Sequence, residues 1–420
     1  MYQYTGCDFL FSGLINKFRF SYKLKDLKKI DVSLNDLGFS DKKGLVRQTD
    51  VWLLILSVGL SLYGALMVCT ATFDGSVYLS RDTLVMLLAL GLGLFACLII
   101  SLIDYDIIYK LWPLIAFGCL GMMLLLIPFG VSPNDRSDAI SWLKLGPLYV
   151  QPSEFLKIGF IITFSHHLQK AKKDLVSIKS VFALCFHAAI PILLVVGTGD
   201  MGSALIFICM FIGMMYVAGV HWLYFPAGAL IVLAASPFIW LKVFSDIQRD
   251  RILALFNPES YPDEIWQQSQ AVNAIKAGGF TGSGLFKGAY THSGLVPECE
   301  NDMIFSVVCE EFGFIGALVL LLLFAALAYR IVRIGKKSRN YAAEIMCYGV
   351  AFMIMSQVMV NIGMCMMILP VIGITLPFIS AGGSSTACLY LAIGLVMSVH
   401  RSSTGIGDDL YRRGILVSDY

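Results

Sequence analysis

Long apolar runs, separated by short polar segments, occupy most of the chain between residues 51 and 399. A helix needs roughly 20 apolar residues to cross the hydrocarbon core of a bilayer. About ten runs approach or exceed that length, so the pattern predicts an all-α polytopic membrane protein with about ten transmembrane helices. The expected spans are 51–71, 83–103, 111–129, 153–168, 178–198, 201–220, 223–244, 303–329, 343–366 and 376–399.

The distribution of Lys and Arg predicts the orientation of these helices. Cytoplasmic loops of membrane proteins carry the excess of positive charge. In this topology one face collects the basic segments, which are the stretch before Val51, 170–179, 330–339 and 401–413. That face is therefore expected to be cytoplasmic. An even number of spans then places both termini on the cytoplasmic side.

Three long segments fall on the opposite, outer face, and they are 130–152, 245–302 and 367–385. Loops of this length are uncommon and are usually functional. The large extracellular loop 245–302 lies between the seventh and eighth helices and is polar and Gly-rich. Its stretch from Ala277 to Gly284 suits irregular backbone close to a ligand or a surface.

Composition supports the membrane assignment and adds few candidates. Of 420 residues 57% are hydrophobic and 14% charged, and the mean hydropathy is +0.76, which excludes the soluble classes. The net charge of +2 gives no reason to expect a nucleic-acid partner. Most of the 11 cysteines fall in apolar spans, where Cys behaves as a small hydrophobe, whereas Cys299 stands alone in a polar loop.

The chain divides into three regions by the same criteria. Residues 1–48 form a basic cytoplasmic extension, which either lies on anionic membrane lipid or is a solvated tail. Residues 49–402 form the transmembrane domain, and 403–420 form a cytoplasmic tail.

Ionisable side chains at membrane depth are expensive and usually face a cavity. Glu154 and Lys157 are three residues apart and so share a helix face. Asp200 interrupts two apolar runs, Asp302 begins the eighth helix where the large loop re-enters the membrane, and Glu310 follows inside that span. These groups gather in the outer half, which predicts a cavity open to the outer leaflet.

Each of these features also has a structural interpretation. The charges on the fourth helix could form only an ion pair, and Asp200 or Asp302 could only cap a helix. The stretch Gly382–Ser385 could be a close helix-packing surface.

Several motifs, taken together and in order, resemble the SEDS family of membrane proteins, which includes RodA, FtsW and SpoVE. The resemblance runs from about Trp52 to about Ser402. The motifs that carry it are Trp142–Gly146 with Gln151–Lys157, Asp200–Ala204, Asn257–Pro258 with Gln267 and Gln270, Pro297–Asp302 with Glu310–Gly313, and Leu376–Ser380 with Gly382–Ser385. The stretches Asn361–Met364 and Leu369–Ile374 look closest to the RodA branch.

The resemblance implies a peptidoglycan glycosyltransferase of the bacterial cytoplasmic (inner) membrane. Such an enzyme polymerises lipid II at the outer face, for cell elongation, together with a class B penicillin-binding protein. Asp302 matches the family's essential loop aspartate and becomes the catalytic candidate. The candidates for substrate binding are Trp142, Lys144, Arg251, Glu298, Ser380 and Ser384; Glu154 with Lys157, Asp200 and Glu310 are further positions of functional or structural weight.

Some positions depart from the family's pattern. Ser141 stands where a basic residue is usual, Glu300-Asn301 where His-Thr is usual, and Ala381 where tyrosine is usual. Arg136, Lys144, Arg249 or Arg251 could supply the missing contacts to pyrophosphate or sugar.

For glycosyl transfer from a pyrophosphate carrier, we expect Asp302 to act as general base or metal-positioning group. Basic groups at the outer face, with Mg²⁺ or Mn²⁺ as the candidate cofactor, would hold the pyrophosphate. Two other functions are alternatives to glycosyl transfer. One is a flippase or transporter for a lipid-linked sugar. The other is a non-enzymatic scaffold that activates a penicillin-binding protein.

Overall fold

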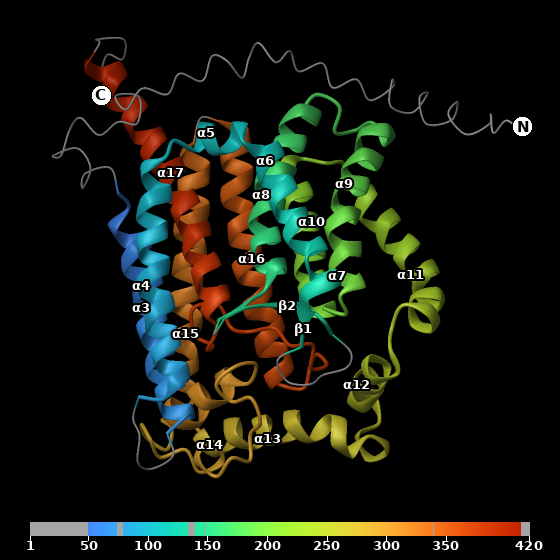
Figure 1. Ribbon diagram of the computed structural model, residues 1–420, viewed down its shortest axis with the longest axis vertical. Coiled ribbons are helices and arrows are strands. Elements are labelled where there is room, and N and C mark those ends of the chain that lie inside the picture. Colours follow the sequence, from blue (N-terminus) through green and yellow to red (C-terminus); the bar gives the residue numbers. More distant parts are fainter. Residues whose placement is uncertain (1–48, 74–78, 133–138, 147, 339, 413–420) are drawn as a thin grey trace, which may run out of the picture. The chain divides into compact units, whose positions relative to one another are not determined.

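Long helices lying side by side form the body of the protein in the computed structural model (Figure 1). The structure describes residues 49–73, 79–132, 139–146, 148–338 and 340–412, all within one unit, 45–420. The predicted N-terminal extension, 1–48, lies outside the described residues. The long helices are α3 (Val51–Ala71), α4 (Arg81–Leu102), α6 (Trp112–Leu124), α8 (Pro152–Ala171), α9 (Ile178–Gly197), α10 (Met201–Ala218), α11 (Tyr224–Lys242), α15 (Ile304–Lys337), α16 (Tyr341–Cys365) and α17 (Gly383–Arg412).

Shorter elements lie at the two ends of this bundle. We call the end that carries α12 (Asp246–Phe256), α13 (Pro262–Gly278) and α14 (Ala289–His292) the loop end, and the end that carries α5 (Tyr105–Lys110) the α5 end (Figure 1). The remaining elements are α7 (Leu126–Phe129), the 3-10 helix η2 (Pro258–Ser260) and strands β1 (Gly130–Val131), β2 (Trp142–Leu145) and β3 (Leu148–Val150). The sequence predicts that the loop end faces outward.

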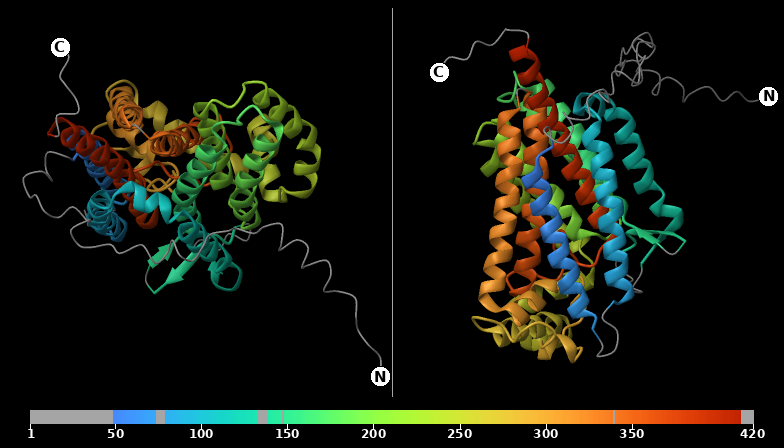
Figure 2. Two further views of the ribbon diagram at one scale, coloured as in Figure 1. Left: turned by 90° about the horizontal axis from the view of Figure 1, so that it is seen from above. Right: turned by 90° about the vertical axis from the view of Figure 1, so that its left-hand side faces the viewer.

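Packing inside the bundle is uneven. Helix α17 packs against α4, α15 against α16 and α3, and α10 against α16 and α9. By contrast, α11 buries none of its residues and stands beside the bundle (Figure 2). The buried polar side chains therefore come from elements other than α11.

Nine of the described helices are long and apolar enough to cross a membrane. The prediction of about ten also counts 153–168, which is α8. This helix carries Glu154 and Lys157 in its first turns and Lys170 in its last. Helix α8 packs against α6, α9 and α16, and most of its residues are buried. Because protein rather than lipid surrounds it, α8 tolerates charges that a lipid-facing span would not.

Two helix boundaries differ clearly from the predicted spans. Helix α15 continues to Lys337, well past residue 329, and Ile331 and Ile334 in the added turns are buried. Arg330 pairs with Asp50 at the start of α3, with Nη2 2.7 Å from Oδ2. Helix α17 begins at Gly383 and not at residue 376. The intervening residues form turns that hold the site described below.

The outer segments contain more secondary structure than predicted. Segment 130–152 holds an antiparallel three-stranded sheet, β1-β2-β3, in which Leu143 faces both Gly130 and Val150. The large loop 245–302, of which only the Gly-rich stretch is predicted to be irregular, is partly helical. The buried residues of α13 recur every three or four positions at Ile265, Gln268, Ala271, Ala274 and Gly278, so one face packs on α15 and α16. The search for apolar runs missed this helix because its buried face carries mainly small residues and an amide.

Helix α15 is broken at Gly313, where φ is +63° and ψ is −161°. The break interrupts the helical bonds that the carbonyls of Glu310 and Glu311 would accept. Those carbonyls instead accept from the N–H groups of Ser283 (2.9 Å) and Gly284 (3.0 Å). Neighbouring loop carbonyls, Gly279 and Phe280, in turn accept from Phe314 (3.0 Å) and Ile315 (3.2 Å). The loop backbone therefore satisfies the groups that the break exposes.

The glycines of 278–284 serve this contact. A Cβ on Gly278 would overlap the carbonyl oxygen of Cys309, and one on Gly282 would overlap that of Glu311. The close approach predicted for this stretch is thus an approach to the backbone of α15.

Candidate active site

Asp302 lies in the turn that precedes α15 and is 8% exposed. The helix begins at Ile304 with Met303 as its N-cap residue. The prediction that Asp302 begins the helix is therefore wrong by two residues. Asn361, on α16, donates from Nδ2 to the Asp302 carbonyl at 2.8 Å. Cys365, one turn later on α16, also points its thiol at that oxygen, at 3.6 Å.

The two residues before Asp302 are held in the same way. The hydroxyl of Ser380 donates to the Asn301 carbonyl at 2.7 Å, and the N–H of Ala381 donates to the Glu300 carbonyl at 2.8 Å. The carbonyls of residues 300, 301 and 302 therefore each have a separate donor from α16 or the segment before α17. The main chain leading to Asp302 is fixed from one side.

Glu298 and Cys299 complete this turn. Glu298 has a positive φ of +51°, and its Oε2 accepts from Asn301 Nδ2 at 2.8 Å. Cys299, which stands alone in the polar loop, is a free thiol and is only 7% exposed. Burial, helped by the neighbouring Glu300 carboxylate, raises the pKa of the Cys299 thiol to about 12.

Segment 366–382 joins this turn to three other helices. Gln268 on α13 donates to the Leu369 carbonyl (2.7 Å), and Arg251 on α12 donates to the Val371 carbonyl (3.4 Å). Asn361 donates to the Ile374 carbonyl at 2.8 Å, with the same Nδ2 that holds Asp302. Gly202, at the start of α10, packs so closely on Ile372 and Ile374 that a Cβ would overlap the Ile372 carbonyl.

A second polar cluster lies at the adjoining starts of α8 and α10. Lys157 Nζ and Glu154 Oε1 are 2.7 Å apart, and the side chains are 0% and 8% exposed. Asp200 caps α10, with Oδ1 accepting from the Ser203 N–H at 2.9 Å. Its Oδ2 accepts from Gln151 Nε2 at 2.9 Å. The carboxylate of Asp200 thus ties two helix starts together, as its structural interpretation requires.

Glu310 is fully buried and points at α14. Its Oε1 accepts from the Tyr290 N–H (2.7 Å), and Oε2 accepts from the N–H (3.0 Å) and hydroxyl (2.6 Å) of Thr291. This carboxylate holds the loop on α15. The neighbouring Glu311 is 1% exposed and lies 3.6 Å from His292 Nε2.

The other residues predicted to bind substrate come from separate elements. Trp142 and Lys144 lie on β2, and the exposed Lys144 ammonium is 5.9 Å from the ring centre of Tyr149 on β3. Ser384 lies half-buried in the first turn of α17. Arg249, a candidate replacement for a family contact, pairs with Asp246, and Arg136 lies outside the described residues.

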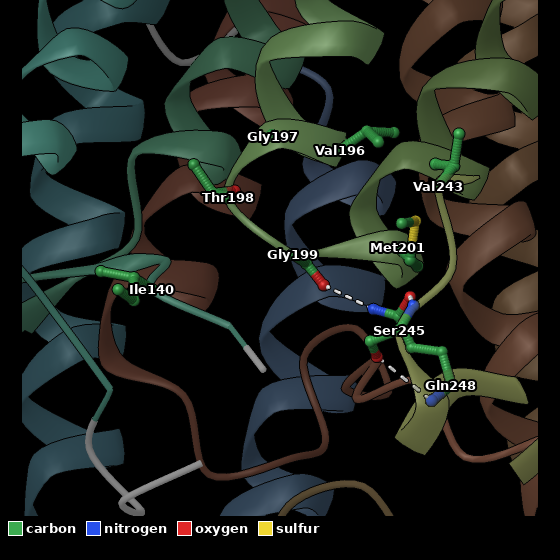
Figure 3. A pocket seen from close by; sticks show the side chains of 9 residues that line it. All are labelled: Ile140, Val196, Gly197, Thr198, Gly199, Met201, Val243, Ser245 and Gln248. Carbon is green, nitrogen blue, oxygen red and sulfur yellow. Dashed lines mark hydrogen bonds between the residues drawn. The ribbon is translucent and has the colours of Figure 1, made fainter. Parts of the chain in front are cut away.

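Figure 3 shows a hollow of about 260 Å³ between the end of α9, the start of α10 and α12. Gln248 donates to the Gly199 carbonyl at 3.4 Å across it, and Ile140 and Thr198 also line it. The hollow borders the residues on either side of Asp200. Asp302 is not among its lining residues.

Asn361 is the polar residue at the Asp302 turn that the site prediction omits. Gln268 supports the Leu369 carbonyl farther along the segment and makes no bond to residues 300–302. A signal was present for Asn361, because an amide inside the apolar run 343–366 needs a partner at membrane depth. Nothing local in the sequence shows which partner it has.

The described residues place no three His, Cys, Asp or Glu side chains where together they could hold a metal ion. They therefore do not fit a metal site built from protein ligands alone.

Comparisons with known proteins agree with this architecture. The profile of the FtsW/RodA/SpoVE family, described as cell cycle proteins, matches residues 51–405. A probable peptidoglycan glycosyltransferase FtsW of Trichlorobacter lovleyi is 32% identical over 83% of this chain and 92% of the relative. Stage V sporulation protein E of Bacillus subtilis is 32% identical over 84% and 97%. Peptidoglycan glycosyltransferase MrdB of Escherichia coli is 31% identical over 70% and 79%.

Solved structures share the fold. The rod shape determining protein RodA of Thermus thermophilus matches with a TM-score of 0.60 at 26% identity, over 84% of this chain and 97% of that chain. A chain of a peptidoglycan synthase complex matches with a TM-score of 0.71 at 24% identity, over 84% and 98%.

The fold and these likenesses define a multi-pass protein of the bacterial cytoplasmic membrane. The chain belongs to the FtsW/RodA/SpoVE family, which is the SEDS family that its motifs resemble. The enzyme class named for the FtsW and MrdB relatives is that of the peptidoglycan glycosyltransferases.

Proposed function

We propose that this chain is a peptidoglycan glycosyltransferase that polymerises lipid II at the outer face of the membrane, with Asp302 as general base. The observation that carries the proposal is the turn 300–302, in which three successive carbonyls are held by Ala381, Ser380 and Asn361. A base is effective only within hydrogen-bond reach of the proton that it removes, so a carboxylate carried by a fixed main chain suits the role.

The reaction joins an acceptor sugar to a donor sugar that is still attached to undecaprenyl pyrophosphate. The acceptor hydroxyl loses its proton to the Asp302 carboxylate as its oxygen bonds to the donor's anomeric carbon. The bond from that carbon to the pyrophosphate oxygen breaks, and the pyrophosphate leaves with the bonding electron pair. Cationic groups of the segments predicted to be outer, of which exposed Lys144 on β2 is one, would stabilise the leaving group.

The same proposal includes a partner and a role. The partner would be a class B penicillin-binding protein that crosslinks the new strands, which accords with the synthase complex that coordinates polymerization and crosslinking. Within the family we assign the chain to elongation, on the strength of the stretches Asn361–Met364 and Leu369–Ile374.

A divalent cation, if required, would be carried by the substrate pyrophosphate, and chelation with EDTA tests that requirement.

A lipid II polymerisation assay in detergent tests the function. We expect the purified chain, with its co-purified partner, to convert labelled lipid II into glycan strands although there is no membrane to cross. A flippase would produce none in detergent but would move lipid II between the leaflets of vesicles. A scaffold would produce strands only through a polymerase active site on its partner, so a partner without that activity gives none.

A further inference from the structure

Side chains from α16 and from the segment before α17 hold the backbone at Asp302. Asn361 is 0% exposed and Ser380 is 3% exposed. Both donate to carbonyls of the turn, Asn361 to residue 302 at 2.8 Å and Ser380 to residue 301 at 2.7 Å. The weaker thiol donor of Cys365, 3.6 Å from the Asp302 carbonyl, does not replace the amide bond. Loss of a hydrogen-bond donor to a carbonyl shielded from water costs free energy, so these contacts are favoured over open alternatives.

The donors of both side chains are fully used. The Ser380 hydroxyl accepts from the Leu376 N–H at 2.8 Å and has one proton, which goes to Asn301. The amide group of Asn361 has two protons, which go to the carbonyls of Asp302 and Ile374. Neither side chain has a donor left for substrate, which argues against the predicted substrate-binding role of Ser380.

We propose that Asn361 and Ser380 are positioning residues, which fix the Asp302 carboxylate at the angle and depth that proton removal requires. The inference rests on the proposed function, because it needs Asp302 to be the base. Proton transfer depends steeply on geometry, and misplacement of a catalytic group by about 1 Å can cost about 100-fold in rate. Loss of these bonds lets the turn move without removing the carboxylate.

Gln268 provides a matched control. It is 1% exposed, and its Nε2 donates to the carbonyls of Met364 and Leu369, each at 2.7 Å. Like Asn361 it is a buried amide that donates to two main-chain carbonyls, one of which lies in segment 366–382. None of its bonds reaches residues 300–302.

The experiment measures steady-state lipid II polymerisation by the detergent-purified chain with its partner. We expect Asn361→Ala to lower kcat about 100-fold and Ser380→Ala at least about tenfold, with KM within about threefold of wild type. Ser380→Thr keeps the hydroxyl and should regain most of the lost rate. Gln268→Ala should lower kcat less than about threefold at a similar loss of thermal stability.

A double variant separates positioning from general damage. In the Asp302→Asn background no carboxylate remains to be positioned, so adding Asn361→Ala should not lower the residual rate further. If Asp302→Asn is inactive while Asn361→Ala and Ser380→Ala lose no more rate than Gln268→Ala, the positioning inference is overturned and the proposed function stands. If Asp302→Asn is fully active, the proposed base fails and the positioning role falls with it. Should Asn361→Ala not fold, the comparison of Ser380→Ala with Ser380→Thr decides.

Discussion

At the scale of single residues, the first turns of α8 contain buried polar groups that are paired with each other. Glu154 and Lys157 form an ion pair with an Nζ to Oε1 distance of 2.7 Å and are almost wholly buried. A buried pair contributes little net stability, but loss of one partner leaves an uncompensated charge. The pair therefore makes α8 sensitive to single substitutions and tolerant of double ones.

Removal of one charge should destabilise the fold. We expect Lys157→Met to cost about 3–5 kcal/mol of folding free energy because the Glu154 carboxylate stays buried without a partner. The double variant Glu154→Gln, Lys157→Met should regain part of that loss. Thermal unfolding in detergent measures both, and equal melting temperatures for the single variant and wild type would contradict a structural pair.

Cys299 should be unreactive despite its place in a polar motif. Its pKa is raised from about 9 to about 12, so the thiolate population near pH 8 falls about a thousandfold. Above about pH 9 the thiol of the unfolded state loses its proton, whereas the thiol of the folded state keeps it. The free energy of unfolding therefore falls as the pH rises through this range. Stability linked to this group is thus complete below pH 9 and is lost as pH rises toward 12.

Maleimide labelling with peptide mapping checks the thiol. At pH 7.5 we expect little modification of Cys299 and ready modification of an exposed cysteine introduced by Ser293→Cys. Equal labelling of both would show that the turn is open.

At the scale of elements, the break in α15 allows the large loop to join the transmembrane bundle. Four backbone bonds between 279–284 and α15 replace two helical bonds lost at Gly313. Glu310 adds three bonds to α14. The loop is therefore part of the bundle's hydrogen-bond network.

A substitution at the break should weaken that joint. Gly313→Ala forces a side chain into a conformation at φ +63° and ψ −161°, and we expect a loss of about 1–3 kcal/mol. Gly118→Ala on α6 is the control, because a Cβ there meets nothing within 4 Å. Hydrogen exchange should show faster exchange at residues 282–284 in Gly313→Ala only. Unchanged exchange there would mean that the break does not hold the loop.

At the scale of the whole molecule, the sequence predicts the helical membrane fold and the family well. Apolar runs locate the spans because the bilayer demands length and hydrophobicity together. The same criterion finds α8 at 153–168, where protein shields the charges, but it misses α13, whose buried face uses small residues. Sequence motifs single out Asp302, but its support by Asn361 and Ser380 depends on contacts about 60 and 80 residues apart, which no local pattern encodes.

The most direct test of the account compares Asp302→Asn with wild type for glycan strand synthesis from labelled lipid II, in detergent and with the partner bound. We expect Asp302→Asn to fold, to bind the partner and to lose polymerisation by at least about 100-fold. Asp263→Asn, at an exposed carboxylate in the first turn of α13, should keep the wild-type rate. Strand synthesis by Asp302→Asn at nearly the wild-type rate would contradict the account.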